Sequence, residues 1–315
     1  MAPDLAVRAR LQRSLAFLAV YLIWGSTYLG IVFAIQSIPP FIMASARFLL
    51  AGGVLYLWAR WRGAPAPRPA QWRWAILLGG LFILIGNGSV VWVEQHLASG
   101  LTAMIVALVS VWTALLEWLR PGGARPSGMV LTGIVLGFLG VGLLVLPRGG
   151  GGHAAPLGVL LLVGSTFAWA LAMVLSRIAD LPASAPLVSG MEMLAGGALL
   201  LLASLVSAEW PAFRLSAVTP KALAAFFYLA FFGSLVTFTA FAWLLQVSTP
   251  NKVATAGYVN PMVAVFLGWA FAGESLSGTT LLASGVIVAS VVLIISGREF
   301  ATPRAVAATP VRDPV

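Results

Sequence analysis

The sequence predicts an all-α integral membrane protein whose ten transmembrane helices form two inverted five-helix repeats around a central cavity. Three observations lead to this fold class. Hydrophobic residues make up 60% of the 315 residues and charged residues only 9%, whereas a soluble domain carries about 25% charged residues. Apolar runs long enough to cross a bilayer recur along the chain, and short sequence matches relate its second half to its first.

The apolar runs divide the chain into ten candidate spans. A spanning helix needs roughly 20 mostly apolar residues, and turn-like stretches such as SIPP, RGAPAPRP and STPNK separate the runs. The first run follows several arginines and has no small-residue cleavage site at a suitable distance, so we expect an uncleaved helix and not a signal peptide. The predicted spans are residues 14–35, 41–58, 74–93, 100–118, 128–146, 156–176, 186–207, 222–244, 253–271 and 279–296.

The connections between these runs are short, so no soluble domain is expected. The chain then divides into five parts: a cytoplasmic N-terminus, a first repeat, an inter-repeat loop, a second repeat and a cytoplasmic tail, over residues 1–13, 14–146, 147–155, 156–296 and 297–315. The tail is rich in Pro and Ala, and we expect it to be disordered.

The positive charges predict the orientation in the membrane, because cytoplasmic loops hold an excess of Lys and Arg. With the N-terminus in the cytoplasm, fourteen Lys and Arg residues fall on the inside and three on the outside. This bias favours a bacterial-type inner membrane protein with both termini cytoplasmic. The inside residues are Arg8, Arg10, Arg13, Arg60, Arg62, Arg68, Arg73, Arg120, Arg125, Arg177, Lys252, Arg298, Arg304 and Arg312.

Short matches between the two halves predict an internal repeat. Trp24 matches Trp169, and the tetrapeptide LAGG at 50–53 recurs at 194–197. Further matches pair Gln95 with Gln246, Trp118 with Trp269 and Gly133 with Gly285. Each half has five spans, and five is odd, so the second copy has to be inverted. Inverted repeats are typical of transporters, whose substrate site lies between the halves near the bilayer midplane.

Composition and motifs exclude several classes of function. There is no cysteine, hence no disulfide framework and no thiolate metal site. No phosphate-binding loop, HExxH motif or histidine cluster occurs, so no cofactor and no bound metal are expected. The net charge of +9 suits a nucleic-acid partner in principle, but basic residues that hold cytoplasmic loops in place account for it.

Five motifs make the chain resemble a known family. They are WGSTYL at 24–29, RFLLAGG at 47–53, GNGSVVWVEQ at 86–95, EMLAGG at 192–197 and YVNPMVAVFLGWAFAGESL at 258–276. Together with the five-plus-five helix pattern, they resemble the EamA branch of the drug/metabolite transporter superfamily over residues 14 to about 296. The resemblance implies a basket of ten helices around a central cavity, and export of amino acids, metabolites or drugs. One feature departs from the family pattern. Many members have an acidic residue after the fourth span that matches the one after the ninth, Glu274, but here the matching position is Gly123.

The stretch YLIWGSTYLG in the first span carries two stripes of polar and small residues. Trp24, Thr27 and Tyr28 lie at i, i+3 and i+4, on one helix face. Ser26 and Gly30 form a small-xxx-small pair, which lets a neighbouring helix come close. We therefore expect the first three to face the substrate pathway and the other two to pack.

Further candidate pathway residues lie in the third, sixth and ninth spans. Asn87 is flanked by glycines and either hydrogen-bonds a neighbouring helix or contacts substrate. Trp169 holds the place that matches Trp24. In the ninth span, the Asn260-Pro step disfavours regular helix, and irregular backbone at that depth is tolerated only against protein or water. Thr255, Tyr258 and Asn260 are therefore candidates as well.

Three ionisable residues require a reason to lie in or near the membrane, because such a group costs roughly 2.5–3.5 kcal/mol at a helix centre. Arg47 is near the outer end of its span, and we expect it to snorkel to the headgroups. Glu94 is at the outer end of the third span, where solvation is the simple expectation. Glu192 is either a buried structural group or a coupling group, and Glu94 and Arg47 are candidates for the same two roles.

These observations predict a secondary active transporter, not an enzyme. Its substrate is a small metabolite, most simply an exported amino acid or a related compound, moved by alternating access. Two alternatives stay open: a facilitative channel-like permease, and a nucleotide-sugar or phosphate-ester carrier, which needs more cationic groups. The expected partners are the substrate and the lipid bilayer, with no nucleic acid and a monomer as the simplest assembly.

Overall fold

The computed structural model describes residues 2–119, 125–145, 156–248, 253, 256–275 and 277–300. Within these ranges the chain forms helices and no strand, as predicted. Among the residues that the structure describes, seven helices are long and apolar enough to cross a membrane, and three shorter apolar helices accompany them. The described residues are therefore those of an all-helical, multi-pass membrane protein.

The described residues of the first half form ten helical elements, some of which join end to end. They are α1 (Ala2–Leu18), the π-helical η1 (Ala19–Ile23), α2 (Trp24–Ala34), α3 (Pro40–Trp61), α4 (Pro69–Gly79), the π-helical η2 (Gly80–Asn87), α5 (Gly88–Val93), α6 (Ser99–Val106), α7 (Val109–Leu119) and α8 (Gly128–Val145).

The second half follows a similar plan. Its described elements are α9 (Pro156–Leu175), α10 (Ala185–Val206), the 3₁₀ turn η3 (Leu215–Ala217), α11 (Pro220–Tyr228), the π-helical η4 (Leu229–Val236), α12 (Thr237–Val247), α14 (Ala256–Ala272) and α15 (Gly278–Phe300). The ninth span was expected from residue 253, of which α14 covers the part from Ala256 onward.

Local sequence explains where several helices begin. Pro40, Pro69, Pro156 and Pro220 each stand at a first helical position, where proline loses no hydrogen bond and its φ suits the helix. The Thr219 side chain accepts a hydrogen bond from the amide of Ala222 and so caps α11. The first helix begins at Ala2, well before the predicted start of the span, so helix extends into the predicted N-terminal segment.

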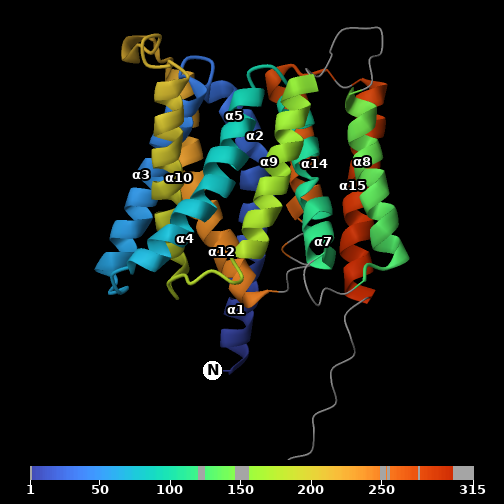
Figure 1. The fold of residues 1–315 in the computed structure, drawn as a ribbon, viewed down its shortest axis with the longest axis horizontal. Coiled ribbons are helices and arrows are strands. Elements are labelled where there is room, and N and C mark those ends of the chain that lie inside the picture. Colours follow the sequence, from blue (N-terminus) through green and yellow to red (C-terminus); the bar gives the residue numbers. More distant parts are fainter. Residues whose placement is uncertain are drawn as a thin grey trace, which may run out of the picture.

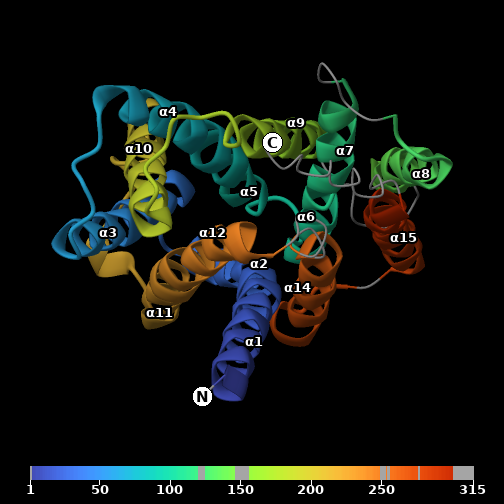
Figure 2. The same ribbon diagram turned by 90° about the horizontal axis from the view of Figure 1, so that it is seen from below.

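The helices run side by side between two ends of the bundle (Figure 1). We call the end at which α1 begins the near end, and the opposite end, with the connections at 35–39, 94–98, 207–219 and 273–277, the far end. Seen along the helices, α4, α5, α9 and α7 form one side and α11, α12, α1 and α14 the other (Figure 2). The α3–α10 pair lies at one lateral edge of this basket and the α8–α15 pair at the other.

Glycines allow α3 and α10 to approach closely. A Cβ on Gly52 would lie 2.7 Å from the Cβ of Met193, and one on Gly190 would lie 2.7 Å from the amide nitrogen of Tyr56. Both distances are far below van der Waals contact, so only glycine fits at these crossings. Gly52 belongs to one copy of the repeated LAGG motif, and Met193 directly precedes the other. The repeated motif therefore lies where the two halves pack together.

Irregular backbone occurs in the first, third, fourth and eighth spans, as η1, η2, the break between α6 and α7, and η4. The π-helical segments η2 and η4 are each eight residues long, and they lie at corresponding places in the two halves. The ninth span was expected to be irregular at Pro261, but α14 continues through this proline. The expected loss of helix at Asn260 is therefore wrong, but Pro261 has no amide hydrogen, so the carbonyl of Gly257 still lacks its usual donor four residues on.

Candidate functional site

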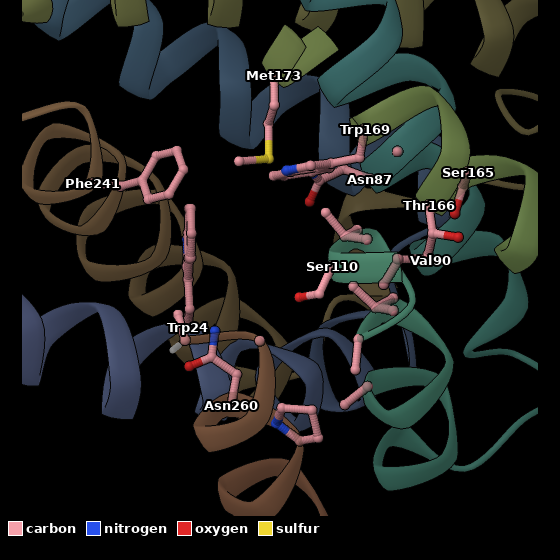
Figure 3. Close-up of a pocket in the computed structure, with 18 of the residues that line it drawn as sticks. Trp24, Asn87, Val90, Ser110, Ser165, Thr166, Trp169, Met173, Phe241 and Asn260 are labelled. Carbon is pink, nitrogen blue, oxygen red and sulfur yellow. The ribbon is translucent and has the colours of Figure 1, made fainter. Parts of the chain in front are cut away.

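A cavity of about 190 Å³ lies in the middle of the basket, and helices of both halves line it (Figure 3). Its walls come from α2, α3, η2, α5, α6 and α7 in the first half of the chain and from α9, α12, α14 and α15 in the second. The wall is mostly apolar, with a few hydroxyls, two amides and two guanidinium groups. Such a mixture is typical of a small-molecule site.

Two tryptophans meet on the cavity wall. The rings of Trp24 and Trp169 lie edge to face with their centroids 6.4 Å apart. Trp24 also packs edge to face on Phe238 at 5.4 Å, and Trp169 on Phe82 at 5.1 Å. The Trp24 Nε1 donates to the carbonyl of Gly233 at 3.2 Å. The repeat partners thus join the two halves and are held by contacts on several sides.

Two asparagine side chains of the wall donate to backbone carbonyls of the π-helical segments. The Asn87 amide donates to the carbonyl of Phe82, five residues earlier in η2, at 3.2 Å. With its amide nitrogen toward the first span, Asn260 donates to the carbonyls of Val20 (3.1 Å) and Tyr21 (3.0 Å) in η1. Both asparagines therefore have a structural partner and still line the cavity.

The two stripes of the first span have different surroundings. Trp24, Thr27 and Tyr28 line the cavity. Ser26 hydrogen-bonds the Tyr228 hydroxyl at 2.5 Å, and a Cβ on Gly30 would lie 3.0 Å from Leu229, so both pack against the eighth span. Thr255 lies outside the described residues, as does the side chain of Tyr258, and their candidacy stays a prediction.

Arg47 does not snorkel to the headgroups. Arg47 is only 2% exposed, and it lines the cavity. The Nε donates to the Ser234 hydroxyl at 2.7 Å, and the guanidinium lies over the ring of Phe48. The Nη1 has no hydrogen-bond partner. The sequence-based expectation is wrong because Ser234, nearly 190 residues away, provides a buried acceptor for the guanidinium.

Glu94 is not solvated either. It is 6% exposed at the far end of α5, and neither carboxylate oxygen has a hydrogen-bond partner. It interacts electrostatically with Arg47 and with Glu274. The neighbouring Gln95 is exposed, as expected.

Glu274, which lacks an acidic counterpart at position 123, caps the start of α6. One oxygen accepts hydrogen bonds from the amide (2.7 Å) and hydroxyl (2.6 Å) of Ser99, and the other accepts from the amide of Gly100 at 3.1 Å. Position 123 itself lies outside the described residues. At the same end, Glu209 accepts from the amides of Phe41 and Ile42, which begin α3. Burial raises the pKa of Glu209, and these two amides oppose the rise.

Glu192 lies away from the cavity. It is 8% exposed on the α10 face that packs against α3 and α4, and it is not part of the cavity wall. Its backbone carbonyl is so close to Gly79 that a Cβ there would lie 2.5 Å from it. The position fits a buried structural group.

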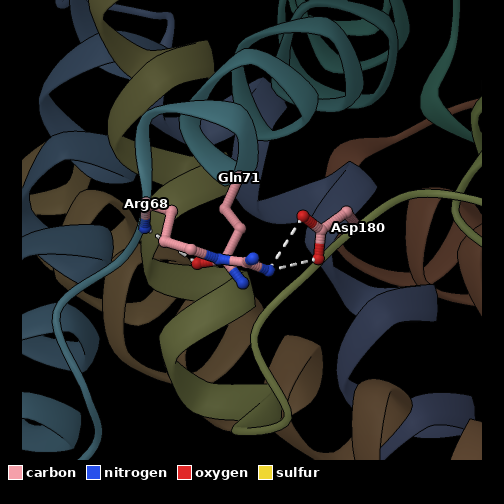
Figure 4. A network of polar contacts seen from close by, with 3 residues as sticks. All are labelled: Arg68, Gln71 and Asp180. Carbon is pink, nitrogen blue, oxygen red and sulfur yellow. Dashed lines mark hydrogen bonds and ion pairs between the residues drawn. The ribbon is translucent and has the colours of Figure 1, made fainter.

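The two ends of the cavity differ. At the far end, Val93, Leu97 and Thr102 are buried. At the near end the wall reaches Arg177, whose side chain is 47% exposed and pairs with Glu117 at 2.8 Å. A second exposed pair joins Arg68 to both oxygens of Asp180, at 2.8 and 2.9 Å, across the α3–α4 and α9–α10 connections (Figure 4). The cavity wall therefore includes a half-exposed side chain at the near end, whereas these three residues at the far end are buried.

Sequence reasoning missed several residues of the wall. Most belong to one stripe of the fourth span, Ala103, Val106, Ala107, Ser110 and Thr113, whose spacing of three and four marks a single helix face. This small and polar stripe was a visible signal. Phe238, Phe241, Met173 and Arg177 also line the cavity and had no such signal. Among the described residues, no cluster of His, Cys, Asp and Glu could hold a metal ion.

Comparisons with known proteins agree with this geometry. The profile of the EamA-like transporter family matches residues 13–146 and 156–296. The uncharacterized inner membrane transporter YedA of Escherichia coli K12 is 35% identical over 300 residues, covering 95% of each chain. Protein PecM of Dickeya dadantii is 28% identical, covering 86% of this chain and 88% of PecM.

Two further matches extend the comparison. A probable amino-acid metabolite efflux pump of Salmonella typhimurium is 26% identical, covering 88% of this chain and 95% of the pump. One crystal structure, described only as that of a protein, shares the fold with a TM-score of 0.64 at 19% identity, covering 92% of this chain and 99% of the other.

Proposed function

Because the chain belongs to the EamA-like transporter family, we propose that it exports amino acids or related metabolites and drugs by secondary active transport. The chain is a membrane transporter; the substrate class, the direction and the mechanism are the proposal. The Salmonella relative named as an amino-acid metabolite efflux pump supports the substrate class.

The proposed architecture is ten spans in two inverted five-helix repeats. Three facts support it. The family profile matches two successive segments of similar length. The π-helical stretches η2 and η4 recur at a constant offset in the third and eighth spans. Finally, the second span packs on the eighth as the seventh packs on the third, and the first packs on the ninth as the sixth packs on the fourth.

The proposed orientation puts the near end in the cytoplasm, together with both termini. The excess of Lys and Arg in connections at that end supports it. The structure then corresponds to a state whose cavity is open to the cytoplasm and closed toward the outside.

The observation that carries the proposal is a cavity lined by both halves, with a half-exposed side chain at its near end and buried residues at the far end. A channel-like permease needs a continuous path, whereas alternating access needs a site closed on one side at a time. Wall contacts between Trp24 and Trp169 join the halves, so rocking of one half against the other changes the shape of this site. Flat apolar or cationic groups suit such an aromatic wall.

The test is a metabolite and drug exchange screen with purified protein in proteoliposomes, with and without a pH gradient. We expect saturable exchange of an amino-acid-like compound. Flux that rises without saturation would favour the channel-like alternative, and exchange restricted to nucleotide sugars or phosphate esters would favour the carrier alternative.

Two matched tryptophan variants connect the activity to the cavity. Trp169→Ala removes an aromatic wall, which is worth about 1 kcal/mol beyond its burial, so we expect roughly fivefold or greater loss of exchange. Trp269→Ala is the control, because Trp269 is 55% exposed and lies off the cavity wall. Equal effects of the two variants would contradict the assigned site.

Thiol accessibility tests the same wall without a substrate, since the chain has no cysteine of its own. A cysteine replacing Thr27 is expected to react with a water-borne maleimide, and one replacing Gly30 is not, because Gly30 faces Leu229. Equal reactivity would remove the first span from the pathway.

A further inference from the structure

The carboxylate of Glu94 is buried without a hydrogen-bond partner. It is 94% buried, and neither of its oxygens accepts a hydrogen bond. An ionised carboxylate in such a place is strongly unfavourable, whereas its neutral, protonated form is tolerated. Two further buried polar atoms at the far end also lack partners: the Arg47 Nη1 and the Thr102 hydroxyl. The far end therefore contains a carboxylate, one guanidinium nitrogen and a hydroxyl without a hydrogen-bond partner.

The charges around Glu94 come from three other elements. Arg47 on α3 attracts its negative charge, Glu274 after α14 repels it, and Tyr28 on α2 is also within electrostatic reach. Glu274 is already engaged with the start of α6. The nearest titratable group along the chain, His96, is exposed and stacks on Trp92. Of the two acids Glu94 and Glu274, Glu94 is thus the one that accepts no hydrogen bond.

We propose that Glu94 is a proton-binding site of the transporter and that its proton keeps the far end of the pathway closed. The inference deepens the proposed function by naming the coupling ion. Binding adds one proton to a carboxylate oxygen and removes one negative charge, with no other bond made or broken. Loss of the proton leaves a charge that only water or Arg47 can stabilise. Opening of the far end supplies that water, so proton release and opening occur together.

A metal cation fits this site less well than a proton. The guanidinium of Arg47 repels a second cation, and its unpartnered Nη1 is a donor that cannot coordinate a metal. The ionised Glu94, by contrast, is an acceptor that this donor suits. The pair therefore alternates between neutral Glu94 beside charged Arg47 and an ionised Glu94 that is hydrated or paired with Arg47.

The far end opens where the end of α5 meets the start of α9. Leu97 and Val93 pack there against Gly158, and a Cβ on Gly158 would lie 3.3 Å from Leu97 and 3.5 Å from Val93. Leu97 is 6% exposed and is not part of the cavity wall. A cysteine at position 97 therefore reports on the far end alone.

The experiment measures the rate at which an impermeant maleimide labels Leu97→Cys in the full chain in nanodiscs, from about pH 6 to about pH 9. One titrating proton changes an opening equilibrium by up to about tenfold per pH unit, so we expect at least a tenfold rise over this range. Gln95→Cys, at an exposed position, corrects for ionisation of the thiol itself. A corrected rate that is flat with pH overturns the proposal.

Substitutions assign the response to a residue. In Glu94→Gln the corrected rate is expected to be low and independent of pH, because the amide imitates the protonated acid. Glu192→Gln is the control, an equally buried acid whose loss is expected to leave the response unchanged. A response that survives Glu94→Gln, or that Glu192→Gln abolishes, overturns the assignment.

A second variant keeps the test decisive if Glu94→Gln does not fold. Removing the positive charge in Arg47→Met makes ionisation of Glu94 harder, so the midpoint of the response is expected to move to higher pH. A midpoint that stays in place or falls contradicts the pairing. A dependence on Na⁺ at constant pH, with no dependence on protons, would make the site a metal site.

The outcome is independent of the exchange screen. A pH-dependent far end without any solute exchange would leave Glu94 in place and remove the proposed transport. Saturable exchange with a flat labelling rate would do the opposite.

Discussion

The two ends of the bundle differ in how they hold their charged residues. At the far end, Arg47 and Glu94 are 2% and 6% exposed, and Glu274 is fixed by three hydrogen bonds to the start of α6. At the near end, the Arg68–Asp180 pair is 67% and 48% exposed and the Arg177–Glu117 pair 47% and 24%.

The difference concerns what it costs to separate the charges. Water screens an exposed pair, so its contribution is small and it separates easily. A buried charge that loses its partner is left without water, which is costly. The near end can therefore exchange partners freely, while the far end resists rearrangement until its buried groups change charge or become hydrated.

Glu274→Ala tests the far end most severely. The variant leaves the amides of Ser99 and Gly100 without their acceptor, and we expect a loss of about 2–3 kcal/mol in stability. Thermal unfolding in detergent measures it, with the exposed Ser275→Ala as control. A loss no larger than that of the control would mean that the cap does not stabilise the far end.

Ser234→Ala removes the acceptor of the buried Arg47. Hydrogen bonds to charged groups contribute about 1.5–3 kcal/mol, so a loss near 2 kcal/mol is expected in the same unfolding assay. Ser165→Ala is a matched control, because the Ser165 hydroxyl is also buried and donates to the Leu162 carbonyl of its own helix. Similar values for both would indicate that Arg47 finds another acceptor.

Glu209→Ala removes the partly exposed cap of α3. Loss of a helix cap costs about 1 kcal/mol, less than at Glu274, because water can reach the amides of Phe41 and Ile42. Amide hydrogen exchange at these two positions is the measurement, and faster exchange confined to the first turn of α3 is the expected result. Unchanged exchange would contradict the capping role.

The near end is expected to give the smallest value. A double-mutant cycle of Arg68→Ala and Asp180→Ala measures the coupling free energy of the pair in Figure 4, which for exposed pairs is below about 0.5–1 kcal/mol. A coupling as large as the Glu274 effect would end the contrast between the two ends.

Periodicity predicted some of the site well. The i, i+3, i+4 spacing of Trp24, Thr27 and Tyr28 identified the face of the first span that lines the cavity. The sequence match also paired Trp24 with Trp169, and the rings of these two residues are in contact. The same reasoning applied to the fourth span would have found Ser110. For Arg47 and Glu94, position along the span suggested solvation, and it was misleading because burial depends on the neighbouring helices.

The sequence by itself determined the membrane environment, the helical class, the repeated halves and the apolar faces, because these follow from composition and spacing along one chain. Tertiary structure alone decided which charges are buried, where the backbone becomes π-helical and which side chains line the cavity together. Those properties depend on partners far apart in the chain, such as Arg47 with Ser234 and Glu274 with Ser99. A hydropathy pattern shows which face of a helix avoids water, but it does not show which side chains of other helices contact that face.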